Sequence, residues 1–158
     1  MKLLFRFSLL LLLLAGLTAC KKDDPLKGKL RYKVALHVTG ENLGGLGAGM
    51  EYSSVRSTLT DPHPGPSGRD AYAVRVDSTY SLGEFGWYDT IEASIFMRNV
   101  NCNAATHPGP GSWLKLEMLV NGVVIDRAEL NSASTRNLSC AAPYLVLALA
   151  SGGSDWDD

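Results

Sequence analysis

The chain has 158 residues, with 15 basic against 16 acidic side chains and a formal net charge of −1. This balance provides no basic field for binding nucleic acid. Hydrophobic residues make up 46% of the chain, and its length is that of one ordinary domain with a substantial core.

The first nineteen residues have the organisation of a signal peptide. Lys2 and Arg6 supply a positive start, and only Ser8 interrupts the apolar stretch 7–14. That stretch is shorter than the roughly 20 apolar residues that a membrane-spanning helix needs. Removal of residues 1–19 would take both cations with it and leave 13 basic against 16 acidic residues.

Residues Leu17-Thr18-Ala19-Cys20 resemble the lipobox of bacterial lipoproteins. The resemblance implies cleavage before Cys20, a diacylglycerol thioether on its sulfur and an acyl chain such as palmitate on the new amino group. Two or more lipid chains anchor a protein stably in a membrane. The alternatives are an ordinary secretory peptide cleaved after Ala19 and an uncleaved anchor helix.

Residues 20–28 are expected to be a lipidated, charged tether. Residue 21 is Lys and not Asp, so the inner-membrane retention signal of some Gram-negative lipoproteins is absent and the outer membrane is the expected location. The lysines followed by Asp23 and Asp24 resemble the surface-export signal of lipoproteins in one large Gram-negative group, which implies a surface-exposed domain. The alternative is a plain solvated spacer below a domain that faces the periplasm.

Alternation of apolar and polar residues predicts seven strands in a domain that spans 29–151. The predicted strands cover 30–38, 50–59, 72–82, 91–98, 114–120, 123–130 and 144–150. The Gly-rich stretch 40–49, the Pro-rich stretch 61–68 and the polar stretch 131–142 are expected to connect them. Asn121-Gly122 is the strongest hairpin signal. The last strand is apolar on both parities, which predicts a strand covered on both faces or lying centrally.

These elements predict an all-β fold, an antiparallel β-sandwich of immunoglobulin-like kind. A closed eight-stranded barrel is the alternative. Tyr32, Val34 and Val38-Thr39-Gly40, with the Asn121-Gly122 hairpin and the final apolar strand, also give a weaker resemblance to small Ig-like lipoproteins of unassigned function. Residues 152–158 have no pattern that could fold alone, and a flexible acidic tail is expected there.

If successive strands alternate in direction, each connection can be assigned to one end of the sandwich. Counting places the loops 61–69, 102–111 and 131–142 at the end that carries the lipid tether, and the loop 83–88 at the opposite end. Cys102 and Cys140 would then lie close together, and outside the cytoplasm such an even pair favours a disulfide. The alternative is two unrelated buried thiols.

The loop 83–88 contains the candidate ligand-binding residues Phe85, Trp87 and Tyr88. Aromatic side chains combine a large apolar area with, in Trp and Tyr, a polar group. They would form a stacking platform for sugar rings or a hydrophobic anchor for a protein partner. The alternative is that Trp87 closes one end of the hydrophobic core.

A metal-site hypothesis rests on His63 and His107, which the strand count places at the same end. Asp61 or Asp70 would supply oxygen ligands, and imidazole with carboxylate suits zinc or copper. The alternative is that the His-Pro-Gly-Pro segments are simply stiff turns.

Catalytic and nucleotide-binding motifs are absent from the sequence: it has no Gly-x-Ser-x-Gly elbow, no His-Glu-x-x-His helix and no phosphate loop. We therefore expect a non-enzymatic, lipid-anchored envelope protein without a cofactor, which acts as a structural module or binds a glycan or an envelope protein. One alternative is a carbohydrate-binding accessory lipoprotein of a surface glycan-uptake system. Another is a metal-binding envelope protein.

Overall fold

The structure is a computed structural model, and it describes residues 30–58, 61–100, 106–137 and 144–156. The elements are β1 (Arg31–Glu41), β2 (Ala48–Thr58), β3 (Asp61–Pro64), β4 (Gly68–Tyr72), β5 (Val76–Gly86), β6 (Thr90–Met97), β7 (Trp113–Val120), β8 (Val123–Asn131), η3 (Ser132–Asn137), β9 (Leu145–Gly152) and η4 (Gly153–Asp155). Within these residues no helix has the length and apolar character needed to cross a membrane.

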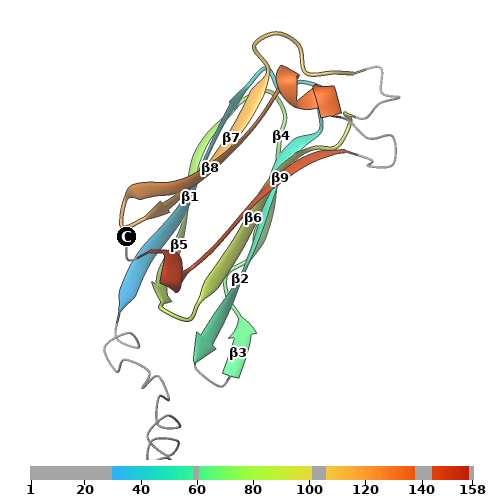
Figure 1. Cartoon of the computed structure of the whole chain (residues 1–158). Coiled ribbons are helices and arrows are strands. Elements are labelled where there is room, and N and C mark those ends of the chain that lie inside the picture. Colours follow the sequence, from blue (N-terminus) through green and yellow to red (C-terminus); the bar gives the residue numbers. More distant parts are fainter. Residues whose placement is uncertain (1–29, 59–60, 101–105, 138–143, 157–158) are drawn as a thin grey trace, which may run out of the picture.

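The strands form two antiparallel sheets that pack face to face (Figure 1). One has the order β5-β1-β7-β8, and the other has the order β3-β2-β6-β9, with β4 also paired to β2. The predicted β-sandwich is confirmed, with more strands than the sequence indicated. The sheets do not close into a barrel, so that alternative is wrong.

The core lies between the sheets, where the predicted alternation places it. On β1 the inner residues Tyr32, Val34, Leu36 and Val38 are buried, and their neighbours along the strand are more exposed. The inner rows of β6 and β7 are buried in the same way. Between β7 and β8, Asn121 and Gly122 have φ values of 52° and 84°, as a two-residue type I′ hairpin requires, and the predicted hairpin is confirmed.

The Pro-rich segment contains two short strands where the sequence indicated only a turn. β3 and β4 both pair with β2, and Pro62 and Pro64 lie in the outermost strand of their sheet. An edge strand tolerates proline because its outward side needs no backbone N–H donor. The strand predicted at 72–82 is divided, since β4 ends at Tyr72 and β5 begins at Val76.

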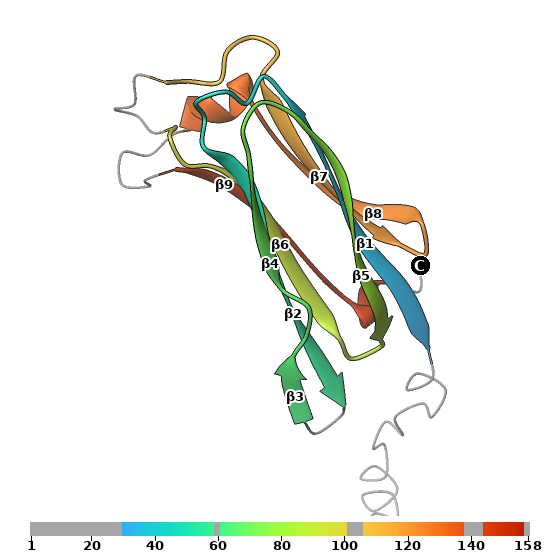
Figure 2. The ribbon, with the colours of Figure 1, turned by 180° about the vertical axis from the view of Figure 1, so that it is seen from behind.

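This division reverses the assignment of connections to ends from β5 onward. The end at which β1 begins, here called the proximal end, also contains the turn 87–89, the hairpin at Asn121 and residues 153–156 (Figures 1 and 2). Arg31 at the start of β1 is paired with Gly86 at the end of β5. The predicted separation of the aromatic loop from the start of the domain is therefore wrong. The distal end contains the connections 42–47 and 106–112, which are hydrogen-bonded to each other.

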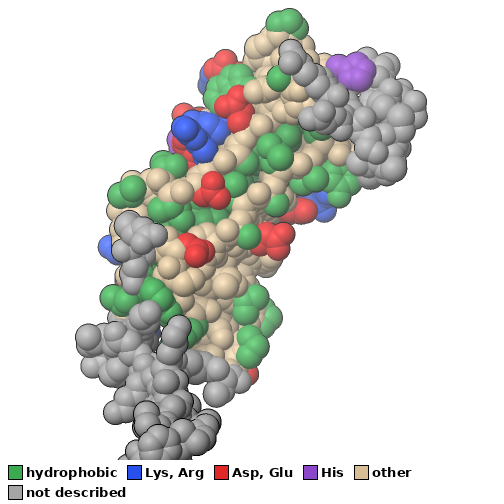
Figure 3. Space-filling model, viewed as in Figure 1, with side chains coloured by type: hydrophobic (Ala, Val, Ile, Leu, Met, Phe, Trp, Pro, Cys, Tyr) green, Lys and Arg blue, Asp and Glu red, His purple; other side chains and the backbone are tan. Residues whose placement is uncertain are grey.

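The final strand, β9, was expected to be central or covered on both faces, and this prediction is wrong. β9 pairs with β6 and is the last strand in the order of its sheet. Val146 and Leu147 are 47% and 41% exposed. Hydrophobic side chains therefore reach the surface along β8 and β9 (Figure 3).

The predicted flexible tail is part of the domain up to residue 156. Gly153–Asp155 form η4, and Trp156 is only 7% exposed. Its ring packs edge-on against Tyr32 at 5.2 Å and Phe85 at 6.0 Å between centroids, and its Nε1 donates a hydrogen bond to Ser151 Oγ. The tail prediction fails because one large aromatic residue can anchor a segment that has no periodic pattern. Asp157 and Asp158 lie outside the described residues.

Candidate functional site

A pocket of about 380 Å³ opens at the proximal end, and this volume falls within the usual range of small-ligand sites. Its walls come from both sheets. They comprise Arg31 of β1, Arg56–Thr58 of β2, His63 of β3, Glu84 and Gly86 of β5, and the turn Trp87–Asp89.

The turn 87–89 is held in place by Asp89, which is buried. Its Oδ1 accepts a hydrogen bond from the Ser57 backbone N–H at 2.8 Å, and its Oδ2 accepts one from the Gly86 N–H at 2.7 Å. Because charged acceptors form strong hydrogen bonds, the carboxylate ties the end of β2 to the end of β5. The Gly153 N–H also donates to the Asp89 carbonyl, which fastens η4 to this turn.

The three aromatic candidates have different surroundings. Phe85 is 0% exposed and belongs to the core, so its assignment as a ligand-contacting residue is wrong. Trp87 and Tyr88 are half-buried and line the pocket. Trp87 also packs against the core. It therefore closes the end of the core on one side and forms a pocket wall on the other.

Arg56 is one of the pocket residues that the sequence pattern did not suggest. It follows Met50, Tyr52 and Ser54 on the inward side of β2, where an apolar residue is usual. The centre of its guanidinium lies 5.2 Å from the centroid of the buried Phe85 ring, within cation–π distance. None of the ion pairs among the described residues includes Arg56.

The structure does not bring His63 and His107 together. His63 lies opposite Arg56 on β3, at the proximal end, and its Nδ1 is 3.4 Å from the Asp61 carbonyl oxygen. His107 lies in the 106–112 connection at the distal end, which contacts residues 42–45. The metal-site prediction depended on the strand count, and it fails for the same reason as the count. Asp70 lies on β4, apart from both histidines.

The cysteines Cys20, Cys102 and Cys140 lie outside the described residues. Lipidation of Cys20 and the disulfide between Cys102 and Cys140 therefore stay predictions. Met97 at the end of β6 is paired with Leu145 at the start of β9, so the two Cys-containing connections are joined to the same end of this sheet.

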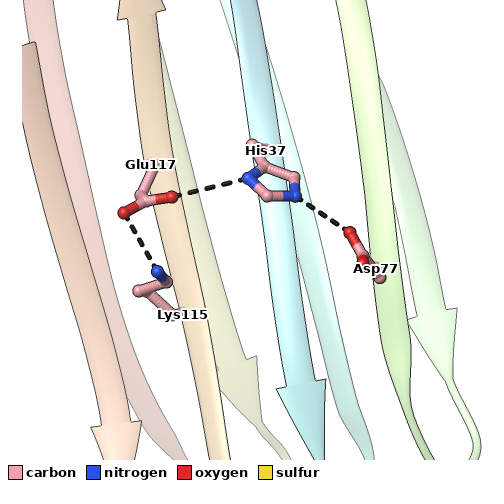
Figure 4. Close-up of polar contacts among 4 residues, drawn as sticks. All are labelled: His37, Asp77, Lys115 and Glu117. Atoms are coloured by element: carbon pink, nitrogen blue, oxygen red, sulfur yellow. Dashed lines mark hydrogen bonds and ion pairs between the residues drawn. The ribbon is translucent and has the colours of Figure 1, made fainter. Parts of the chain in front are cut away.

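A second polar cluster lies on the outer face of the β5-β1-β7 strands (Figure 4). His37 Nε2 is 2.9 Å from Asp77 Oδ1, and His37 Nδ1 is 3.4 Å from Glu117 Oε2. Lys115 Nζ donates to Glu117 Oε1 at 3.0 Å. The cluster joins three neighbouring strands, and this connection indicates a stabilising role for it.

Glu117 makes a pH-dependent contribution to stability. The hydrogen bond from Lys115 holds the pKa of Glu117 below its ordinary value of 4.5, against the opposing effect of burial. A lowered folded-state pKa stabilises the fold above the ordinary value, and the contribution is lost as the pH falls through the folded-state pKa. We expect Glu117→Gln to lower the free energy of unfolding by about 1 kcal/mol at pH 7 and much less below about pH 4.

Urea denaturation at the two pH values measures this difference. Lys115→Met and the double variant complete a thermodynamic cycle, in which the second substitution should add little to the first. An equal loss at both pH values would contradict the assignment.

Three tyrosines connect the sheets on the opposite side of the sandwich from β8 and β9. The Tyr72 hydroxyl of β4 is 3.0 Å from the Tyr80 hydroxyl of β5, and the Tyr52 and Tyr80 rings are 6.5 Å apart. Burial raises the pKa of Tyr72 above its usual range, and the hydrogen bond to Tyr80 adds to this effect. Burial also raises the pKa of Tyr80, and the hydrogen bond of Tyr80 with Asp70 raises it further. Both phenols therefore stay neutral and bridge the two sheets.

The two carboxylates of the proximal pocket have other charged or hydrogen-bonding groups beside them. Both Asp89 carboxylate oxygens accept backbone hydrogen bonds, and Glu84 lies opposite Lys33 in the β1–β5 pairing. These two carboxylates do not form the free facing pair that glycoside hydrolysis uses. No group of three or more His, Cys, Asp or Glu side chains within the described ranges could hold a metal ion. Comparison with models of protein families, with curated proteins and with solved structures finds no match for this chain.

Proposed function

We propose that the protein is a lipid-anchored, non-enzymatic binding module of the bacterial cell envelope, with its ligand site in the proximal pocket. The observation that carries this proposal is the shared lining of the pocket by Trp87, Tyr88 and Arg56. Half-buried aromatic rings next to an arginine are the residue types that dominate the energetics of recognition sites. The signal-like residues 1–19 and the lipobox ending at Cys20 support the anchor and the outer-membrane location.

A carbohydrate is the ligand class that this lining supports best. Sugar rings offer an apolar face that can stack on Trp87 and hydroxyl groups that need hydrogen-bond partners. The pocket supplies such partners through Arg56 and through the hydroxyl groups of Ser57 and Thr58. This site supports the carbohydrate-binding accessory lipoprotein more than a purely structural module.

Substitution of Trp87 tests the proposal. We expect Trp87→Ala to weaken binding of the full chain to polysaccharide by about tenfold or more, because a central aromatic contact is lost. Retention on columns of immobilised polysaccharide gives the measurement, with the chain purified in detergent and its N-terminal peptide identified by mass spectrometry.

Trp113→Ala is the matched control, since Trp113 is also half-buried but begins β7 at the distal end. Thermal melting of each variant establishes that it is folded. Equal retention of Trp87→Ala and the unmodified chain would refute the proposed site.

A further inference from the structure

Arg56 adds a charge requirement to the proximal pocket. We infer that the pocket selects saccharides that carry a carboxylate, and that the Arg56 guanidinium binds this group. The inference rests on the proposed function, because it names the ligand class of the same site.

The position of Arg56 is the first argument. The side chain extends from the inward side of β2, and its guanidinium lies over the buried Phe85 ring. Arg56 is half-buried, so its guanidinium loses part of its hydration, and a neighbouring anion would compensate this loss. No described acidic side chain is within ion-pair distance of Arg56. A ligand carboxylate would provide the missing partner, in the bidentate geometry that a guanidinium favours.

The nearby acidic residues do not replace such a ligand. Asp89 lines the same pocket, but the Ser57 and Gly86 backbone N–H groups occupy its two carboxylate oxygens. Glu84 is an exposed residue at the edge of the pocket, and it lies opposite Lys33 in the strand pairing. Directly opposed residues of opposite charge interact with each other across two strands.

The charge of the lining favours a carboxylate over a phosphate. Two arginines, Arg31 and Arg56, face two acidic residues, Glu84 and Asp89, around the pocket. Such a balanced lining does not supply the concentration of positive charge that a doubly charged group needs. A singly charged carboxylate matches one planar guanidinium.

A second arginine of this protein shows the contrasting arrangement. The centre of the Arg69 guanidinium lies 5.5 Å from the centroid of the Phe96 ring. This arrangement resembles that of Arg56 over Phe85. However, Arg69 Nε is 3.7 Å from Glu51 Oε2, so this guanidinium already has a carboxylate neighbour. Arg69 also lies outside the proximal pocket. It is therefore the matched control for Arg56.

The experiment compares polygalacturonate, a uronic acid polymer, with neutral dextran. Binding of the full chain in detergent is measured by titration calorimetry at about 0.15 M salt, where distant surface charges are screened. We expect Arg56→Lys to weaken binding of polygalacturonate by about tenfold or more, because lysine lacks the planar fork. Binding of dextran should weaken much less, because a neutral polymer forms no ion pair with Arg56. Arg69→Lys should bind both polymers as the unmodified chain does. Arg56→Met, which keeps an apolar stem over Phe85, should show the same selective loss.

The outcomes separate this inference from the proposed function. If Trp87→Ala loses binding and Arg56→Lys retains it for both polymers, the carboxylate inference is overturned and the proposed site stands. If neither substitution weakens binding, both are overturned. An equal loss in Arg56→Lys and Arg69→Lys would indicate a general charge effect and would overturn the inference. Displacement of polygalacturonate by an equimolar amount of inorganic phosphate would overturn the choice of a carboxylate.

Discussion

Replacement of Trp156 by alanine is expected to lower the free energy of unfolding by about 3–5 kcal/mol, the usual range for truncation of a buried tryptophan. The ring fills the proximal end of the core against Tyr32 and Phe85, and it is 7% exposed. The substitution would leave a cavity between the sheets and would release η4. In a domain of this size the melting temperature should fall by about 10–20 °C, which calorimetry measures.

Trp156→Phe separates packing from hydrogen bonding at this position. It keeps an aromatic ring but removes the hydrogen bond that Trp156 Nε1–H donates to Ser151 Oγ. These two atoms are 2.7 Å apart. We expect a smaller loss, of about 1–2 kcal/mol. A melting temperature of Trp156→Ala equal to that of the unmodified chain would show that the last residues are not part of the folded domain.

Gly153→Ala is expected to destabilise the domain by about 2–3 kcal/mol through overpacking. A Cβ atom at this position would lie 2.5 Å from Trp87 Cα and 2.6 Å from the Trp87 carbonyl carbon. Both are backbone atoms of the turn that lines the pocket, so neither can rotate away. The substitution should therefore also weaken polysaccharide binding, since relief of the overlap displaces Trp87. Denaturant titration and column retention measure the two effects.

Gly44→Ala is the control for this substitution. Gly44 lies in the distal connection, and a Cβ atom there would have no neighbour within 4 Å. The Gly44→Ala substitution should change the free energy of unfolding by less than about 0.5 kcal/mol. If Gly153→Ala matches Gly44→Ala in both measurements, the contact between the last residues and the turn is not formed in solution.

The regular part of the sandwich could be predicted from the sequence because its strands have one buried face. The inner rows of β1 and β7 follow strict alternation, and Asn121-Gly122 has the residues of a type I′ turn. β3 could not be recognised in the same way, because Pro62 and Pro64 normally indicate a turn and are compatible with a strand only at an edge. The assignment of every later connection to an end of the sandwich was reversed because 72–82 was taken as one strand, without the preceding passage of β3 and β4 along β2.

The candidate site was only partly accessible to sequence reasoning. The aromatic content of residues 85–88 indicated a recognition surface, and Trp87 and Tyr88 do line a pocket. The contribution of Arg56 depends on a contact between sheets, with a ring 29 positions later in the chain. The strand pairing of Arg56 with His63 was equally hidden, since it exists only when β3 is recognised. An arginine on the inward parity of β2 was the signal that could have identified the site.

If the domain is tethered to a membrane through Cys20, the proximity of the pocket to the start of β1 would limit how a ligand can approach. With a lipid on Cys20, as proposed, the segment from there to Arg31 spans at most about 40 Å when fully extended. A folded domain of 100 residues has a radius of gyration of about 13 Å, so its full width would occupy most of that gap. A single polysaccharide chain is far thinner and could slide between the domain and the bilayer surface. The tether would thus act as a size filter that admits slender polymers and excludes bulky globular partners.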